Sequence, residues 1–443
     1  MIDTIAAIST PFGEGAVAVL RVSGGQAVEI ADAVFQAKRK AGELPARFQQ
    51  FGRIVDGERK LDDVLLTVFR APHSYTGEDV VEITCHGGVL VTRRILDLLL
   101  SKGARSAEPG EFTQRAFLNG KMDLTQAEAV MDLITAQTDL ALRAASEQLE
   151  GRLGDRVRGL RKALLGLLAH TEASIDFPDE HLDPDADDVL LGKLAKARKE
   201  AQSLLSTARE GRILREGVRT VIYGMPNVGK SSLLNRLLGY ERAIVSARPG
   251  TTRDVIEEVI DLRGIPLRLV DTAGIRDSSD EIEQQGMERT RRQVERADLV
   301  LHVVDASAPR SGEHLTNVPQ ELLVLNKMDL GEHESWREVE GVRVTCLADG
   351  GLAPLDDAIT TRITGGTAAH RDWSVAINAR HQACLDRAVS FCHAAEQAMR
   401  DGLSPEFVAE ELRGALEAVG DIVGRADADE VLGQIFSTFC IGK

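Results

Sequence analysis

Aromatic residues are scarce in this chain of 443 residues, at 4% of the sequence against 43% hydrophobic residues in all. This balance is ordinary for a soluble, helix-rich protein. Long apolar runs are also missing, because no segment approaches the roughly 18 unbroken apolar residues of a membrane span. The first residues, MIDT, contain no basic region followed by an apolar one. We therefore expect neither a secretion signal nor an association with membranes.

Cysteines are few, odd in number and scattered. The chain has five, and no two are spaced as C-x-x-C: Cys85, Cys346, Cys384, Cys392 and Cys440. This usage argues against disulfides and against structural zinc, and it suits a reducing compartment. The expected location is the cytoplasm.

Positive charge is in short supply as well. The chain has 69 acidic residues but only 53 lysines and arginines, so its net charge is -16. Broad binding to nucleic acid depends on clustered basic residues, which argues against a general nucleic-acid coat. RNA contacted by a local basic patch, or by a partner subunit, is still compatible with this charge.

A phosphate-binding loop occupies residues 224–231, GMPNVGKS, which complete the pattern G-x-x-x-x-G-K-S. The apolar VIY before it and the helix-like SLLNRLL after it provide the strand and helix that the motif requires. Glycines let backbone N–H groups converge on one phosphate, Lys230 can reach the β- and γ-phosphates, and Ser231 can ligate Mg²⁺. The alternative, a chance glycine-rich turn, is disfavoured by both flanks. The predicted contacts are Asn227, Val228, Gly229, Lys230, Ser231 and Ser232.

Further motifs identify the nucleotide as GTP. Residues 271–274, DTAG, follow a strand-like segment and bring Asp271 near the metal ion and the Gly274 amide near the γ-phosphate. In residues 326–329, NKMD, Asp329 can accept hydrogen bonds from N1 and the exocyclic amine of guanine, which adenine cannot offer. The alternative is a nucleotide site that has lost its activity. It is disfavoured because GMPNVGKS, the Thr251-Thr252 pair, DTAG and NKMD all occur in the expected order. The predicted GTP contacts here are Thr251, Thr252, Asp271, Thr272, Ala273, Gly274, Asn326, Lys327 and Asp329.

The residue that positions the attacking water is not evident from these motifs. In Ras-like switches a glutamine directly after the D-x-x-G glycine has this role, and here that position is Ile275. An aliphatic side chain cannot hold water by hydrogen bonds, so another residue must do so. The acids that follow are all candidates: Asp277, Asp280, Glu281, Glu283 and Glu288.

The source of positive charge for the transition state is open too. No arginine finger can be singled out among Arg248, Arg253 and Arg276. The side-chain oxygen of Asn227 could ligate a monovalent cation beside the phosphates, or it could only cap the loop.

The guanine site also ends unusually, because TCL at residues 345–347 stands where a Ser-Ala-Lys-like triplet is expected. We expect this to weaken guanine affinity rather than to remove specificity.

Hydrophobic periodicity organises the rest of the chain, whose length allows about three domains of ~150 residues. Apolar runs separated by turns predict a β-rich α+β domain at 1–118. Three- and four-residue apolar steps from Leu124 to Leu168 predict amphipathic helices, which the acidic segment 176–188 ends. Further helices are expected at 189–210, 380–400, 405–423 and 428–439. Between them, alternating strands and helices predict a doubly wound α/β nucleotide domain inserted into a discontinuous helical domain.

Four blocks together resemble the MnmE (TrmE) family of tRNA modification GTPases: GTTRD (250–254), DTAGIR (271–276), PGEFTQRAFLNGKMDLTQAEA (109–129) and the terminal FCIGK (439–443). The likeness runs from the first strand to the last residue, and the two blocks outside the nucleotide domain are the most specific. It implies an N-terminal tetrahydrofolate-binding and dimerisation domain at 1–118, helical parts at 119–213 and 369–443, and a Ras-like P-loop G domain at 214–368.

The resemblance also implies an activity. Members of the family are potassium-stimulated GTPases whose two G domains meet in a homodimer when GTP binds. With the flavin- and NADH-using partner MnmG, in a heterotetramer, they add a carboxymethylaminomethyl or aminomethyl group to carbon 5 of the wobble uridine (position 34) of certain tRNAs. The one-carbon unit comes from 5,10-methylene- or 5-formyl-tetrahydrofolate.

Site residues carried over from the family complete the expectation. Glu283 matches the water-orienting glutamate, and Ser231 and Thr252 match the Mg²⁺ ligands. The potassium loop corresponds to Asn227, Ser246, Arg248 (through its carbonyl) and Thr251, with Ser246 also among the GTP contacts. Ser246 stands where threonine is common, and Arg248-Pro249 replaces a more usual aliphatic-alanine pair.

The folate pocket and the C-terminus are carried over in the same way. The matching pocket residues are Arg21, Glu78, Lys121 and Lys443, whose cations suit the glutamate tail and whose carboxylate suits the donor edge of the pterin. Cys440 matches a near-terminal cysteine required for modification, and its role as nucleophile, acid or packing residue is open.

Two other functions share part of these motifs. A ribosome-assembly GTPase would share the P-loop and Ile275, but it should append a basic RNA-binding module, whereas the flanks here are acidic and helical. A folate-dependent methyltransferase would have no need of complete GTP motifs.

Overall fold

The structure is a computed structural model that describes residues 3–177, 186–239, 243–244, 258–270, 293–310, 319–365, 376–424 and 429–443. The chain divides into two compact units. One contains Met1–Met131, Leu149–Ala197 and Ser390–Lys443, and the other contains Asp132–Gln148 and Arg198–Val389. The predicted limits of the three domains stay a prediction.

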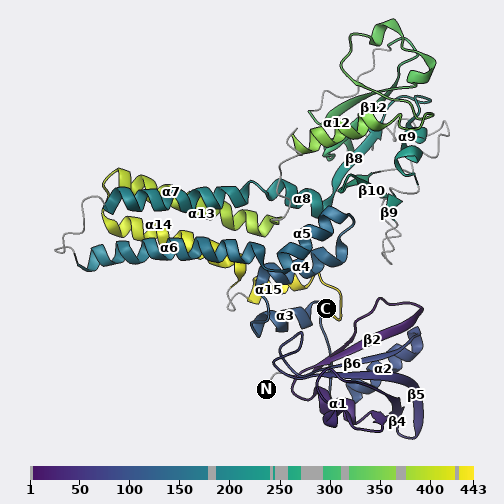
Figure 1. The fold of residues 1–443 in the computed structure, drawn as a ribbon, viewed down its shortest axis with the longest axis vertical. Coiled ribbons are helices and arrows are strands. Elements are labelled where there is room, and N and C mark those ends of the chain that lie inside the picture. The colour runs from purple at the N-terminus through teal and green to yellow at the C-terminus, as the bar shows by residue number, and fades with distance from the viewer. Residues whose placement is uncertain are drawn as a thin grey trace. The chain divides into compact units, whose positions relative to one another are not determined.

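The N-terminal part of the first unit is a seven-stranded sheet in the order β3-β4-β5-β6-β2-β1-β7 (Figure 1). Its neighbouring strands are antiparallel except for the parallel pair β1 and β7. The strands are β1 (Ile5–Ile8), β2 (Gly15–Ser23), β3 (Phe35–Ala37), β4 (Gln49–Asp56), β5 (Arg59–Phe69), β6 (Val80–Gly87) and β7 (Arg105–Ser106).

Buried and exposed side chains alternate along the strands, and this alternation shows which face of the sheet the helices cover. On β5, Val64, Leu66 and Val68 are buried while Leu65 between them is exposed. The buried side chains pack against α1 (Ala27–Asp32) and α2 (Val89–Ser101) in one core. Because side chains alternate between the two faces of a strand, this pattern places both helices on one face of the sheet.

The hairpin of β4 and β5 was only half predicted. The sequence indicated a strand at 64–69, whereas β5 begins at Arg59 and β4 precedes it. The two strands are joined by Gly57-Glu58, with Gly57 at φ 59, so the Asp-Gly pair at 56–57 was a usable turn signal. The strand β4 and the start of β5 were not predicted because the residues on their outward face are polar, or are single apolar residues between polar ones.

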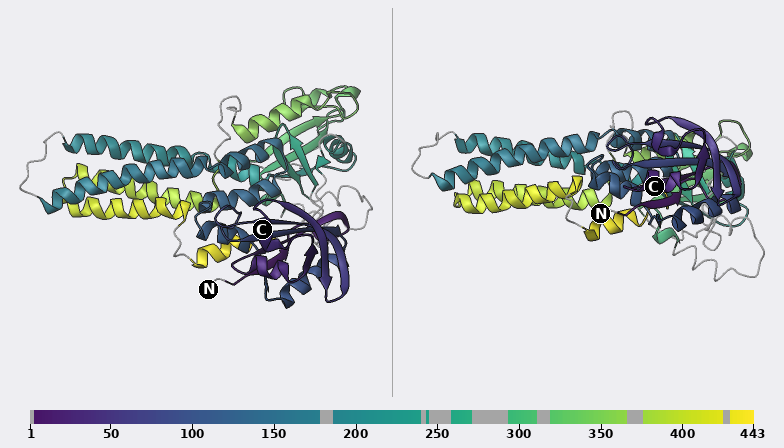
Figure 2. Two further views of the ribbon diagram at one scale, coloured as in Figure 1. Left: turned by 60° about the horizontal axis from the view of Figure 1, so that its bottom comes forward. Right: turned by 90° about the horizontal axis from the view of Figure 1, so that it is seen from below.

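Helices make up the rest of the first unit, and α8, most of α5 and parts of α4, α7 and α13 belong to the second. In the first unit, α6 and α14 run side by side with the adjoining parts of α7 and α13 (Figures 1 and 2). The helices from 111 to 216 and from 379 onward are α3 (Glu111–Leu118), α4 (Leu124–Thr135), α5 (Asp139–Leu149), α6 (Arg152–Asp176), α7 (Ala186–Leu205), α8 (Ala208–Glu216), α13 (Ala379–Arg400), α14 (Pro405–Val423) and α15 (Asp429–Phe436).

The helix predicted at 189–210 is two helices, with a break at Ser206 and Thr207. The hydroxyl of Ser206 donates to the carbonyl of Ser203, and that of Thr207 donates to the carbonyl of Leu204. Such side-chain hydrogen bonds compete with the backbone ladder of a helix, which explains the break.

The nucleotide domain in the second unit is also built on a seven-stranded sheet, in the order β14-β13-β12-β8-β11-β10-β9. The strands from β14 to β11 are parallel, and β10 and β9 are antiparallel. They are β8 (Val218–Tyr223), β9 (Ala243–Ile244), β10 (Glu258–Leu262), β11 (Ile265–Leu269), β12 (Leu299–Asp305), β13 (Glu321–Asn326) and β14 (Val342–Arg343), with helices α9 (Lys230–Leu237) and α12 (Ala353–Thr364).

The position of β8 locates the ligand site of this domain. The strand order turns at β8, which has β11 on one side and β12 on the other. In open α/β sheets, ligands bind beyond the carboxyl ends of the strands at such a switch point. The predicted fold class, a β-rich α+β N-terminal domain, a helical domain and a doubly wound P-loop domain, is confirmed.

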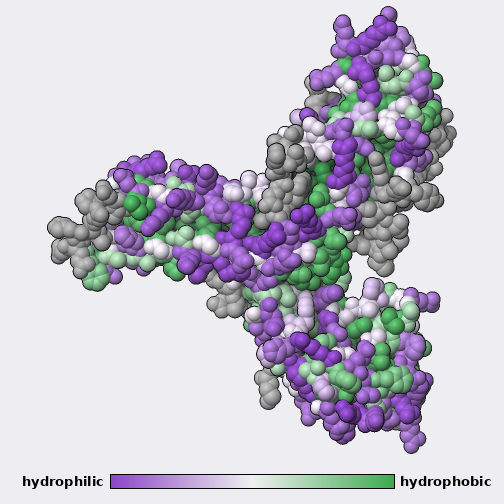
Figure 3. Space-filling view, viewed as in Figure 1, coloured by the Kyte–Doolittle hydropathy of each residue, from purple (hydrophilic) through white to green (hydrophobic). Residues whose placement is uncertain are grey.

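Hydrophilic side chains cover most of the surface in view, and hydrophobic ones form smaller patches between them (Figure 3). Within the described ranges, no helix combines the length and apolar character that crossing a membrane would take.

Candidate functional site

The phosphate-binding loop leaves the carboxyl end of β8 and enters α9. Gly224 has φ 149 and Gly229 has φ 99, conformations that residues with a side chain rarely adopt. A Cβ atom on Gly224 would collide with the carbonyl of Val303, and one on Gly229 would collide with the Asn326 amide. The sequence therefore needs glycine at both positions for the loop to lie this close to the strands. Asn227 also has a positive φ, of 65.

The lysine of the loop is held by backbone carbonyls. Lys230 Nζ donates to the carbonyl oxygens of Gly224, at 2.9 Å, and Met225, at 2.8 Å. Burial lowers the pKa of Lys230. A phosphate oxygen accepts stronger, charge-assisted hydrogen bonds than a neutral carbonyl, so this ammonium is poised for a phosphate ligand. Ser231 and Ser232 follow it in the first turn of α9.

The NKMD segment begins at the end of β13 and touches the phosphate-binding loop. Asn326 is 2% exposed, and its Nδ2 donates to the carbonyl of Val228 at 2.9 Å. Lys327 has φ 63 and pairs with Asp305 at 2.7 Å. Burial raises the pKa of Asp305, but the hydrogen bonds from Lys327 and Ser307, together with the charge of Lys327, outweigh it and hold the pKa below its usual range. Two loops far apart in sequence are thus joined into one site.

Thr345, in the TCL segment expected at the guanine site, makes a contact that the sequence reasoning missed. Its hydroxyl donates to Asp329 Oδ1 at 2.6 Å, and its Oγ1 accepts the backbone N–H of Leu347 at 3.3 Å. The TCL segment therefore orients the carboxylate expected to read guanine. A hydroxyl residue at the end of β14, next to the NKMD segment, was the available signal.

Cys346 completes this edge of the site. Its thiol donates to Asn326 Oδ1 at 3.5 Å, and burial, followed by the charge of Asp329, raises its pKa. The thiol therefore stays protonated and keeps donating at neutral pH.

Nine predicted site residues lie outside the described residues: Ser246, Arg248, Thr251, Thr252, Asp271, Thr272, Ala273, Gly274 and Glu283.

A second group of predicted residues lies in the N-terminal domain. Arg21 on β2 donates to Glu82 Oε1 at 2.7 and 3.1 Å. Its guanidinium lies 5.4 Å from the ring centre of Tyr75 and 5.7 Å from that of Phe112. The cation is therefore held between a carboxylate and two aromatic rings, a geometry that favours a fixed orientation.

Glu78 is held by two neighbours, one of which the sequence reasoning missed. Ser23 donates to Glu78 Oε2 at 2.7 Å, and Arg115 Nη1 lies 3.2 and 3.3 Å from the two carboxylate oxygens. Arg115 is buried and also contacts Asp3 and Glu111. Ser23 and Arg115 therefore fix the position of the Glu78 carboxylate.

Asp3 and Glu111, two carboxylates that contact Arg115, have lowered pKa values. A hydrogen bond from Arg105 holds the pKa of Asp3 below its usual range. For Glu111, burial raises the pKa, but hydrogen bonds from Arg105, from the backbone of Glu108 and from Arg115 outweigh it. Asp3 and Glu111 therefore stay ionised at neutral pH.

Lys121 lies between α3 and α4, and its side chain reaches the loop that precedes Glu78. Its Nζ donates to the carbonyl of Pro72 at 2.9 Å. Its stem lies beside Gly77, where a Cβ would come within 3.4 Å of it.

The C-terminal tail docks on the start of α3. Ile441 forms an antiparallel bridge with Pro109, the N–H of Gly110 donates to the carbonyl of Cys440 at 3.4 Å, and that of Phe112 donates to the carbonyl of Lys443 at 3.2 Å. Phe112 is the residue whose ring faces Arg21. The tail thus brings the backbone of Lys443 and of the exposed Cys440 against the start of the helix that carries Phe112.

Two family models match the chain. The model described as the MnmE helical domain matches residues 124–440, and the one described as the GTP-binding protein TrmE N-terminus matches residues 4–121. Among solved structures, the G domain of the T. maritima FeoB iron transporter covers 34% of this chain and 98% of its own, at 25% identity and a TM-score of 0.25, and adds nothing to the assignment.

Relatives match over the whole length. The tRNA modification GTPase MnmE of Akkermansia muciniphila is 51% identical over 444 residues, 99% of each chain. The protein of the same name from Natranaerobius thermophilus is 45% identical over 455 residues, 100% of this chain and 99% of its own. That of Geobacillus thermodenitrificans is 44% identical over 458 residues, with the same coverage. This chain belongs to the MnmE family of tRNA modification GTPases, and it is a GTP hydrolase acting in tRNA modification.

Proposed function

We propose that this chain is a potassium-stimulated GTPase that works with MnmG to add a carboxymethylaminomethyl or aminomethyl group to carbon 5 of uridine 34 in certain tRNAs. The observation that carries the proposal is the docked tail, whose backbone pairs with Pro109, Gly110 and Phe112, and the Phe112 ring lies 5.7 Å from the Arg21 guanidinium. Because the tail ends at this cluster, we expect the Cys440 thiol and the Lys443 ammonium to serve the reaction there.

Nucleotide binding and hydrolysis use the loops around β8 and β13. Backbone N–H groups of the loop and Lys230 neutralise the β- and γ-phosphates. Asn326 ties the guanine loop to the phosphate loop through Val228, and Asp329 reads the base while Thr345 holds it. Ile275 offers no hydrogen bond to water, and Glu283, which matches the family's water-orienting glutamate, is proposed to orient it instead.

Two cations fit the donors of this site. Ser231, directly after the loop lysine, carries a hydroxyl oxygen of the kind that Mg²⁺ accepts, with Thr252 as the second side-chain ligand. Asn227 is held with φ 65 in the loop, and its amide oxygen suits an alkali ion together with oxygens of Ser246, Arg248 and Thr251. A bound potassium ion supplies positive charge next to the phosphates, as an arginine finger does elsewhere.

The potassium role gives a direct test. GTP turnover of the purified chain should be roughly tenfold or more faster in potassium than in sodium buffer, because one well-placed positive group at a phosphoryl transition state is worth at least that much. Asn227→Gly should abolish the difference and keep GTP affinity. Glycine is the suitable replacement because it accepts φ 65 without strain. Equal rates in both buffers would contradict the cation role.

The N-terminal pocket is proposed to hold a one-carbon tetrahydrofolate. Arg21, Lys121 and Lys443 suit the negatively charged glutamate tail, and an ionised Glu78 suits the donor edge of the pterin. Arg115 and Ser23 support this use because both hold the Glu78 carboxylate in place. When bound, the folate supplies the one-carbon unit of the modification. Cys440 serves as nucleophile, acid or packing residue in that reaction.

The proposed assembly is the one that membership of the MnmE family implies. Two copies of the chain form a homodimer through their N-terminal domains, and the dimer combines with MnmG into a heterotetramer that acts on tRNA in the cytoplasm.

A further inference from the structure

A protein that acts on tRNA with a net charge of -16 needs a local surface for the RNA backbone. One groove in the described part of the helical bundle has the required charge. It lies between α6 and α7 and encloses roughly 440 Å³. Its lining consists of Gly159, Lys162, Ala163, Gly166, Leu167, His170, Leu190 and Lys193, with no acidic residue among these.

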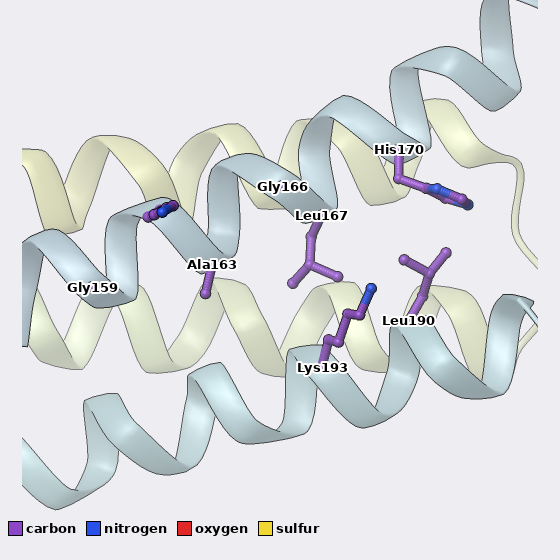
Figure 4. A pocket seen from close by; sticks show the side chains of 8 residues that line it. Gly159, Ala163, Gly166, Leu167, His170, Leu190 and Lys193 are labelled. Carbon is purple, nitrogen blue, oxygen red and sulfur yellow. The ribbon is translucent and has the colours of Figure 1, made fainter.

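The shape of the groove comes from small residues on α6. Figure 4 shows Gly159, Ala163 and Gly166 along one helix, and Leu167, Leu190 and Lys193 pointing into the space between the two helices. A Cβ atom added to Gly159 or Gly166 would meet no atom of the described chain within 4 Å. Glycine weakens a helix interior, and here no internal contact requires it. The two glycines therefore leave room for something outside the chain.

The charge of the groove is not neutralised internally. Lys162 and Lys193 are exposed, and neither forms an ion pair or hydrogen bond with any residue in the described ranges. Two acids of α6 already pair with arginines, Asp155 with Arg158 at 2.8 Å and Glu172 with Arg413 at 2.9 Å. The two lysines are thus left for an external anion.

Lysines and arginines outnumber acids by nine to six on these two helices, and the balance is reversed on α14. Arg161 on α6 and Lys196 on α7 are exposed as well. In contrast, α14 carries five acids and a single arginine: Glu406, Glu410, Glu411, Glu417 and Asp421 against Arg413. This separation of charge within one bundle favours a polyanion over an ordinary protein partner, whose surface mixes both signs.

We propose that the groove between α6 and α7 is a tRNA-docking surface of this chain, in which Lys162, Lys193 and His170 contact backbone phosphates. The open faces of Gly159 and Gly166 allow the sugar-phosphate ridge to approach the helix backbone. The contacts are to phosphates, so they position the tRNA without reading its sequence. The inference rests on the tRNA modification activity and not on the potassium or folate sites.

Binding of a fluorescently labelled, unmodified tRNA transcript to the full-length chain tests this surface. Lys162→Glu/Lys193→Glu should weaken binding roughly tenfold at moderate salt and lower the slope of log affinity against log salt by about 2, because each lysine neutralises one phosphate. Lys38→Glu/Lys102→Glu is the matched control, because it makes the same change in net charge at exposed positions of the N-terminal domain. The control should bind tRNA like the unmodified chain.

A second variant separates the groove from its charge. Gly159→Leu/Gly166→Leu should weaken tRNA binding by filling the space, while its thermal midpoint stays level or rises because leucine favours a helix more than glycine does. GTP turnover should be unchanged in all three variants, which shows that they are folded. Unchanged tRNA affinity in the lysine variant would overturn the proposal, and loss of MnmG binding with intact tRNA binding would identify the groove as a protein interface instead.

Discussion

Asp329→Asn should lower GTP affinity by at least roughly 100-fold and create a preference for xanthosine triphosphate. The carboxylate accepts two charge-assisted hydrogen bonds from guanine, each worth about 1.5–3 kcal/mol, so losing both costs about 3 kcal/mol or more. Xanthine carries a carbonyl oxygen where guanine has its amine, and an asparagine N–H can donate to that oxygen. Dissociation constants for the two nucleotides, measured on the same preparations, would check the exchange.

The matched control for this prediction is Thr345→Val. It keeps the carboxylate but removes the hydroxyl that donates to Asp329 Oδ1 at 2.6 Å. The free energy of GTP binding should become less favourable by about 1 kcal/mol, which is a roughly fivefold loss of affinity. Affinity for xanthosine triphosphate should not increase. If Asp329→Asn kept its preference for GTP, this residue would not read the base.

Removal of the last four residues, 440–443, should leave GTP turnover unchanged and abolish tRNA modification. The tail contacts Pro109, Gly110 and Phe112, and none of these contacts involves the nucleotide loops. The shortened chain can no longer present Cys440 and Lys443 beside the pocket. The measurement is modification of a tRNA transcript by the chain with MnmG, alongside GTP hydrolysis in the same mixture.

Point variants divide the tail into docking and chemistry. Gly442 has φ 95, and a Cβ there would lie 2.6 Å from the carbonyl of Ile8, so Gly442→Val should displace the tail and prevent modification. Cys440→Ser should keep the tail docked, because the contact uses only the carbonyl of that residue. Activity in Cys440→Ser would assign the thiol a packing role. Full modification by the shortened chain would contradict the account of the tail.

Elements built from local pattern were predictable from the sequence. The strand, loop and helix of the phosphate site appear at β8 and α9, and the helix expected at 405–423 appears as α14 with those bounds. Glycine at 224 and 229 and apolar periodicity are local signals, and short-range geometry explains both.

Residues whose role depends on distant partners were not predictable in the same way. Arg115 acts through Asp3 and Glu78, far from it in sequence, and Thr345 acts through Asp329 on another loop. A charge on a helix and a hydroxyl after a strand are both common on protein surfaces, so the sequence alone did not indicate these partners. The β4 strand was missed for a related reason, because its pairing with β5 rather than its own pattern defines it.

Mass spectrometry of the wobble uridine tests the central claim, that GTP hydrolysis by this chain drives modification of tRNA. In cells lacking the gene, uridine 34 of the affected tRNAs should be without its carbon-5 group. The unmodified chain should restore it, and Glu283→Ala, which should bind GTP without hydrolysing it, should not. A normal carbon-5 group in the absence of the gene, or full restoration by Glu283→Ala, would contradict the account.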